Sequence, residues 1–183
     1  MAVVWIILAI IVLVALYVLM QYNGLVKVRN RIENAWAQID VQLKRRHDLI
    51  PNLVETVKGY ATHEKATLEA VINARNAAMG AQTVGDKGAA ENGLSGTLKS
   101  LFALGEAYPD LKANQNFLNL QEELTGTEDK IAYSRQFFND EVRSYNTKIQ
   151  SFPTNILAKK FAFAQREYFQ TDTAERGPVS VKF

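Results

Sequence analysis

Residues Ala2–Met20 have the sequence AVVWIILAIIVLVALYVLM, an unbroken apolar run with no charged side chain. At 1.5 Å of rise per helical residue, the run extends roughly 28 Å, close to the thickness of the hydrocarbon core of a bilayer. The sequence beyond Gln21 is of the ordinary soluble type. We therefore predict one membrane-spanning helix over residues 1–21. Representative positions of this predicted span are Ala2, Trp5, Ile10, Leu16 and Met20.

A secretory signal peptide is the competing interpretation of this run. Such a peptide has a basic segment, a shorter apolar stretch and a cleavage site made of small residues. Here nothing basic precedes the run, the run is longer, and residues 21–25 (QYNGL) offer no such site. The absence of cysteine also excludes a lipoprotein anchor. A retained membrane anchor is therefore the prediction.

The charges that follow the span predict its orientation. Lys27, Arg29 and Arg31 lie just beyond it, and positive charge near a span favours the cytoplasmic side. We therefore expect a cytoplasmic soluble domain in a bacterial cell membrane, with a short N-terminus outside. The rule weakens when a large domain follows the span, so the opposite orientation stays open.

The rest of the chain, about 160 residues, is long enough for one domain with a real core. Its 21 Lys+Arg against 19 Asp+Glu give almost no net charge, which argues against nucleic-acid binding. Apolar residues recur every three or four positions over residues 25–50, 54–78, 94–104 and 117–149. This spacing is typical of packed amphipathic helices. The predicted fold class is all-α, with the transmembrane helix continuing into an antiparallel helical bundle.

The predicted breaks leave two arrangements open. Pro51 and Pro109 each lack the amide hydrogen that a helix interior uses, and five glycines between residues 80 and 96 predict a flexible loop. Chain reversals at these three places give a four-helix bundle. Kinks at the two prolines give one long two-helix hairpin instead. The predicted organisation is an anchor (1–21), a long-helix bundle (22–152) and a membrane-proximal segment with the C-terminal tail (153–183).

In both arrangements the chain returns to the membrane end after residue 150. The segment that arrives there mixes aromatic rings with basic side chains, a composition typical of the membrane surface. The alternative is that its rings cap the open end of the bundle. Residues 177–183 alternate apolar and polar side chains, as a short extended strand does. The residues predicted to contact the membrane surface are Phe152, Lys159, Lys160, Phe161, Phe163, Arg166, Tyr168 and Phe169.

Several charged residues fall at positions where the helical period predicts burial. Because a buried charge without a partner costs several kcal/mol, such residues should pair with one another. A polar layer of this kind would fix helix register or recognise a neighbouring subunit. Alternatively, these side chains lie at the edge of the seam with their charged groups in water. The residues of this predicted layer are Arg46, Glu64, Arg75, Glu128 and Arg135.

The sequence contains no recognisable catalytic or metal-binding motif. Gly-x-Ser-x-Gly is absent, and the glycine-rich stretch has neither a preceding strand nor Ser or Thr after Gly-Lys. His47 and His63 have no metal-ligand spacing and are expected as polar residues on helix flanks. We predict no enzymatic activity, no cofactor and no metal.

Sequence motifs along the chain closely resemble the LemA family of bacterial membrane proteins. The most specific is IDVQLKRRHDLIPNLV at residues 39–54. Ala162 departs from the family, which often has Gly there. The resemblance implies one span, a helical soluble domain, no established reaction, and a link of some relatives to internal membrane compartments. The other matching motifs are YNGLV (22–26) with Arg29, Ala35-Trp36, VKGYAxHE (57–64), LxLQxEL (118–124), Tyr145-Asn146, FPxN (152–155) and Tyr168-Phe169.

Three functions from different classes remain open at this stage. The first is a non-enzymatic scaffold that self-associates through its helices, binds the lipid bilayer, and organises or shapes the membrane. The second is a membrane-tethered adaptor for another protein, such as a membrane protease or a signalling protein. The third is a hydrolase or small-molecule binding protein, for which the sequence offers no catalytic constellation.

Overall fold

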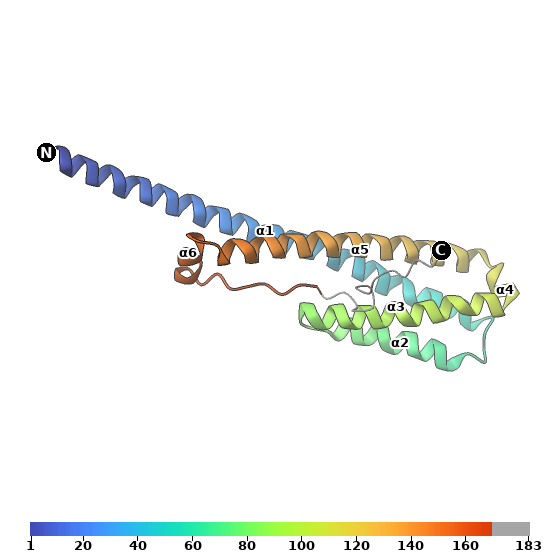
Figure 1. Cartoon of the computed structure of the whole chain (residues 1–183). Helices are drawn as coiled ribbons and strands as arrows, with labels where there is room; N and C mark the ends of the chain where they lie inside the picture. Colours follow the sequence, from blue (N-terminus) through green and yellow to red (C-terminus); the bar gives the residue numbers. More distant parts are fainter. Residues whose placement is uncertain (170–183) are drawn as a thin grey trace, which may run out of the picture. The chain divides into compact units, whose positions relative to one another are not determined.

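The computed structural model describes residues 1–169 (Figure 1). All its regular elements within these residues are helices, which confirms the predicted all-α class. Contacts divide the described chain into two units. Unit 1 comprises Met1–Ala37 and Gln136–Glu167, and unit 2 comprises Gln38–Arg135 with residues 168 and 169. The helices are α1 (Ala2–Lys58), α2 (Lys65–Gly80), α3 (Val84–Ala107), α4 (Pro109–Lys112), α5 (Gln115–Gln150) and α6 (Thr154–Lys160).

Unit 1 contains the apolar run and the part of α1 after it, which packs against α5. Residues 2–20 form the first part of α1 and are almost entirely exposed, as expected of a helix that needs lipid around it. Farther along the same helix, Leu25, Ile32 and Ala35 are buried and Val28 is half-buried, and this stretch packs beside the C-terminal part of α5. Trp36 contacts Phe138 across these two helices, with ring centroids 5.5 Å apart. The amphipathic period predicted after the span therefore forms a real helix–helix contact.

A single amide fixes the path of the chain after α6. The side chain of Asn146, buried on α5, donates from Nδ2 to the carbonyl oxygen of Arg166 at 2.9 Å. Its Oδ1 accepts the N–H of the same residue, also at 2.9 Å. One amide side chain thus satisfies both main-chain groups of Arg166, as a neighbouring strand would. The segment 161–167 is thereby attached to α5.

Unit 2 is a bundle of four helical segments: residues 38–58 of α1, then α2, α3, and residues 115–135 of α5. The chain reverses at residues 59–64, at 81–83, and around α4. Unit 2 therefore has the reversals of a bundle and not the two helices of a kinked hairpin. Its main core cluster consists of buried aliphatic residues and the ring of Phe117.

The reversal predicted at Pro51 is absent. Pro51 lies inside α1, which continues to Lys58 before the chain turns. Leu53, Val54 and Val57, beyond the proline, are buried in the core of unit 2. Burial of this last turn stabilises the helix against the loss of one backbone hydrogen bond. Pro109, in contrast, begins α4 at its first position, where a missing N–H does no harm.

The predicted glycine-rich loop at 80–96 is also wrong. Only residues 81–83 connect α2 to α3, and α3 is helical from Val84. Thr83 caps this helix by accepting the N–H of Asp86 at 3.0 Å. Leu94, Leu98 and Leu101 are buried on one face of α3. Their burial offsets the low helix propensity of the glycines between them.

Alanine at two of these glycines should stabilise the protein. Gly93 and Gly96 are exposed inside α3, and a Cβ added at either would meet no atom within 4 Å. Each of Gly93→Ala and Gly96→Ala is expected to raise the free energy of unfolding by about 1 kcal/mol. Chemical denaturation followed by circular dichroism would measure it.

Gly105→Ala is the matched control on the same helix. A Cβ at Gly105 would come within 3.2 Å of Cε1 of Phe117, so crowding should remove the gain. Clear destabilisation by Gly93→Ala would contradict the helical assignment of this stretch.

Candidate functional site

The most buried cation in unit 2 is the guanidinium of Arg46 on α1, which is 2% exposed. Its Nη1 lies 2.9 Å from Oε2 of Glu128 on α5 and 3.4 Å from Oε2 of Glu91 on α3. Its Nη2 donates to Oγ of Ser95 at 2.7 Å, and Ser95 lies 3.1 Å from Oε1 of Glu128. One arginine therefore connects three helices of the bundle.

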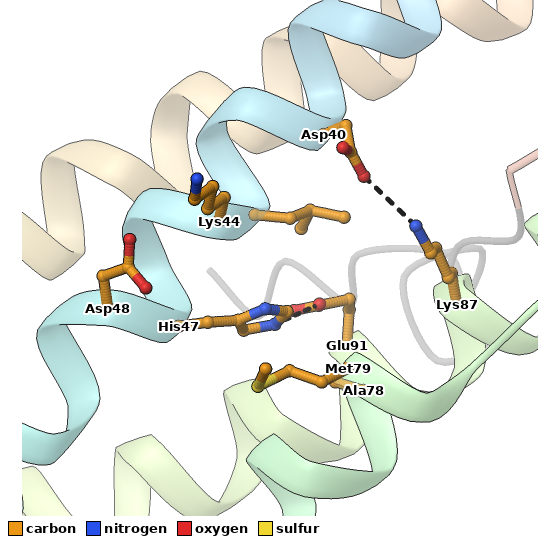
Figure 2. Close-up of a pocket in the computed structure, with 9 residues that line it drawn as sticks. Asp40, Lys44, His47, Asp48, Ala78, Met79, Lys87 and Glu91 are labelled. Atoms are coloured by element: carbon orange, nitrogen blue, oxygen red, sulfur yellow. Dashed lines mark hydrogen bonds and ion pairs between the residues drawn. The ribbon is translucent and has the colours of Figure 1, made fainter.

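His47 completes this ion network from the neighbouring position of α1. Its Nε2 lies 2.7 Å from Oε1 of Glu91, a contact drawn as a dashed line in Figure 2. Because a carboxylate oxygen only accepts, Nε2 carries the hydrogen. Glu91 is 1% exposed and uses one oxygen for His47 and the other for Arg46. Both oxygens of this buried carboxylate are thus satisfied.

Opposing effects act on the charge of Arg46. Burial lowers the pKa of Arg46 from its ordinary value, while the carboxylates of Glu128 and Glu91 raise it and Arg135 lowers it further. An arginine still keeps its proton under such conditions. The network therefore places a permanent cation between two carboxylates, and removal of one partner would leave an uncompensated buried charge.

Arg75 has a different role from the one its period predicted. Its Nε, on α2, donates to the backbone carbonyl oxygen of His47 at 2.7 Å. In a regular helix that carbonyl would accept the N–H of the residue four positions later, which here is Pro51. Arg75 therefore supplies the donor that the proline lacks. This contact explains how α1 passes through Pro51.

The other two residues of the predicted layer lie elsewhere. Arg135 on α5 is buried; its Nη1 donates to Oδ1 of Asn92 at 3.1 Å, and its guanidinium lies 5.5 Å from the ring centre of Phe169. Glu64 follows α1 and accepts the hydroxyl of Tyr108 at 3.1 Å, which raises the pKa of that tyrosine. Glu64 is therefore no part of the network, and its assignment to the layer is wrong.

Sequence reasoning missed three members of the network. His47 was expected on a helix flank but is buried, and Glu91 and Ser95 fall in the stretch expected to be a loop. One signal could have identified Glu91. It lies three positions before Leu94 and seven before Leu98, in phase with the buried leucines.

Two pockets border the network. One, of about 310 Å³, is bordered by His47 and Glu91 and has the exposed ion pair Asp40–Lys87 at its rim (Figure 2). The other, of about 360 Å³, is bordered by Arg46, Ser95 and Arg135. The residues that line the first pocket include no hydroxyl nucleophile for His47 to activate, and Ser95 in the second is held by Arg46. Within residues 1–169, potential metal ligands do not gather in a group of three or more. The geometry suits a structural connection between helices.

The residues predicted at the membrane separate into several places. The predicted span residues are exposed on α1, as are Lys27 and Arg31, whereas Arg29 is half-buried with its guanidinium 5.9 Å from the ring centre of Phe163. Phe152, Lys159 and Lys160 are exposed around α6. The span residues in question are Ala2, Trp5, Ile10, Leu16 and Met20.

The later residues of that predicted surface differ in their surroundings. Arg166 has its guanidinium 3.8 Å from the carboxylate of Glu33, a residue about 20 Å along α1 from Met20. Tyr168 is exposed in unit 2, and its membrane contact stays a prediction. Phe169 is buried beneath Arg135, so its prediction as a surface residue is wrong. The strand predicted at 177–183 lies outside the described residues.

Comparison with known proteins gives a consistent assignment. A model of the LemA family matches residues 35–183. Protein LemA of Metamycoplasma hominis is 29% identical over 161 residues, which cover 86% of this chain and 72% of that protein. Magnetosome protein MamQ of Magnetospirillum gryphiswaldense is 26% identical, with 88% of this chain and 69% of MamQ covered. Magnetosome protein MamQ 2 of Paramagnetospirillum magneticum is 27% identical, with the same coverage.

Proposed function

This chain belongs to the LemA family, and we propose that it is a non-enzymatic scaffold that self-associates and organises or shapes the bacterial membrane. Its exposed apolar helix supports a membrane location. The observation that carries the proposal is the continuity of α1 within unit 1. The same helix forms the apolar run and, from Leu25, the part of unit 1 that packs against α5. If the soluble helices of several copies associate, the membrane spans attached to them would therefore be arranged side by side in the bilayer.

Two further observations support this function. Two of the relatives are named magnetosome proteins, and their names describe no enzyme. The buried ion network connects three helices, and the hydroxyl of its Ser95 already accepts a hydrogen bond from Arg46, which fits a rigid structural body. The charges of Lys27, Arg29 and Arg31 favour a cytoplasmic location for this body.

The surface proposed for self-association lies on α1 and α5. The most exposed large apolar side chains of unit 2 are Tyr133 on α5, at 74%, and Val41 on α1, at 63%. Val41 lies one helical turn before Arg45, which forms an ion pair with Glu123 of α5 at 3.5 Å. Apolar side chains exposed to this degree are suited to burial against a second copy of the chain.

Light scattering coupled to size-exclusion chromatography, corrected for detergent, would test self-association. We expect the full chain at micromolar concentration to run as a multiple of its 20.5 kDa mass. The double variant Val41→Ser, Tyr133→Ser should shift this population toward monomer, because it removes apolar area from the contact.

Ile72→Ser, Met79→Ser is the matched control, since both side chains are exposed on α2. A strict monomer at micromolar concentration would contradict the scaffold. Capture of a stoichiometric non-self protein by crosslinking in cells would instead support the adaptor function.

A further inference from the structure

The short helix α6 is attached to α1 at the place where the apolar run ends. Oγ1 of Thr154 lies 3.4 Å from Oε1 of Gln21, and the ring centre of Phe161 lies 5.0 Å from that of Tyr22. Gln21 and Tyr22 directly follow Met20, the last residue of the run. Both ends of α6 are therefore held beside the first residues after the apolar run. Figure 1 shows α6 beside α1 with the N-terminal part of α1 extending beyond it.

A tight turn after α6 adds a second ring to this attachment. Ala162 has φ 55°, in the left-handed region that favours glycine. The turn is closed by the N–H of Phe163, which donates to the carbonyl oxygen of Ala158 at 2.9 Å. It places Phe163 5.8 Å from Tyr22, on the same ring as Phe161. The turn therefore brings two rings, those of Phe161 and Phe163, against Tyr22.

The two faces of α6 differ in character. Thr154 and Ala158, one helical turn apart, are buried on its inner face. On the outside, Ile156 is 58% exposed, and Lys159 and Lys160 are exposed beside it. Phe152, just before the helix, is 80% exposed, more than Trp5 within the span. The outer side therefore combines uncovered apolar groups with two cations.

We propose that residues 152–163, the foot, bind the surface of the same bilayer that the span crosses, with a preference for anionic lipid. Phe152 and Ile156 would enter the boundary between headgroups and acyl chains, and Lys159 and Lys160 would contact anionic headgroups. Two features favour lipid as the occupant: the foot adjoins the end of the apolar run, and its lysines complement anionic headgroups. The proposal rests on the membrane anchoring proposed above and assigns the foot a ligand.

The absence of cysteine allows a site-specific probe in the full chain. The Phe152→Cys variant, labelled with an environment-sensitive fluorophore, is reconstituted into vesicles of phosphatidylcholine and phosphatidylglycerol that contain nitroxide-labelled lipids. We expect quenching that reports a depth near the headgroups. The same label on Arg143→Cys, an exposed position of α5 in unit 1, is the control and should stay unquenched.

Charge reversal tests the role of the lysines. Lys159→Glu, Lys160→Glu in the labelled chain should lower the ratio of lipid-bound to free foot by more than about 30-fold, since each lysine contributes about fivefold near an anionic surface. Lys159→Arg, Lys160→Arg should retain quenching, and salt should weaken it. Circular dichroism would verify that both variants stay helical.

A probe on the span separates failure of the foot from failure of the anchor. If the labelled Leu8→Cys variant is quenched while the foot probe remains in water, the foot proposal is overturned and the anchor stands. If neither probe is quenched, anchoring fails and the foot proposal with it. A foot probe that is shielded from water but not quenched by lipid would show that protein covers the foot, which also overturns the proposal.

Discussion

Arg46→Met is expected to lower the free energy of unfolding by about 3–5 kcal/mol, because it leaves a buried carboxylate without its cation. Glu91 is almost completely buried and would keep only the N–H of His47. Glu128 is partly exposed and can be hydrated, so most of the loss comes from Glu91. Denaturation of the full chain in mild detergent, followed by far-ultraviolet circular dichroism, would measure the change.

The neighbouring arginine provides a matched control. Arg45 pairs with Glu123 at 3.5 Å, but both side chains are about half exposed. Arg45→Met should therefore change stability by less than about 1 kcal/mol. Equal effects of the two variants would mean that Arg46 lies in water and that the network does not form. In the Arg46→Met background, Glu91→Leu should recover part of the loss, because it removes the unpaired charge.

Arg75→Met is expected to lower the free energy of unfolding by about 1.5 kcal/mol, the lower end of the range for a charged donor, because Arg75 is only half-buried. The loss has a specific cause: the carbonyl oxygen of His47 would have neither a helical partner nor a side-chain donor. Pro51→Ala supplies an N–H at the helical position. In that background, Arg75→Met should therefore have a clearly smaller effect.

A double-mutant cycle on the two positions measures this dependence directly. The control cycle replaces Arg75→Met by Arg143→Met. Its coupling energy with Pro51→Ala should be close to zero, since Arg143 is exposed and pairs locally with Asp140. Additive effects of Arg75→Met and Pro51→Ala would contradict the substitution of one donor for the other. The measurement is the same denaturation experiment on the four chains.

The helical fold was predictable because its signals are repeated along the sequence. Every buried helix face adds another apolar residue at the expected spacing, so no single position decides the result. The turns depend on few residues, and there tertiary packing prevailed. Pro51 stays helical because Arg75, on α2, donates a hydrogen bond to the carbonyl oxygen of His47 on α1. The glycines of α3 stay helical because the leucines on one face of that helix are buried. Neither contact is visible in the local sequence.

The candidate site was predictable only in part, for a related reason. The period identified Arg46 and Glu128 as charges on buried faces, and the structure brings them within 2.9 Å. The partner that matters most, Glu91, lies on a helix that the glycines concealed. His47 depends on the same partner, so its burial could not be inferred before α3 was placed. Pairing across three helices requires their relative register, which one amphipathic pattern does not contain.

The side chain of Asn146 forms hydrogen bonds with the main-chain N–H and carbonyl oxygen of Arg166, groups that nearly every residue type possesses. The route of the chain past α5 is therefore insensitive to which side chain occupies position 166, apart from proline, which has no N–H to offer. The residue that determines this route is therefore Asn146 on α5, and not a side chain of the segment 161–167. Substitutions in this segment can change the side chains that it exposes while its backbone keeps the same path, provided that Asn146 is retained. An aspartate in its place would lack the N–H donor and lose half of the grip.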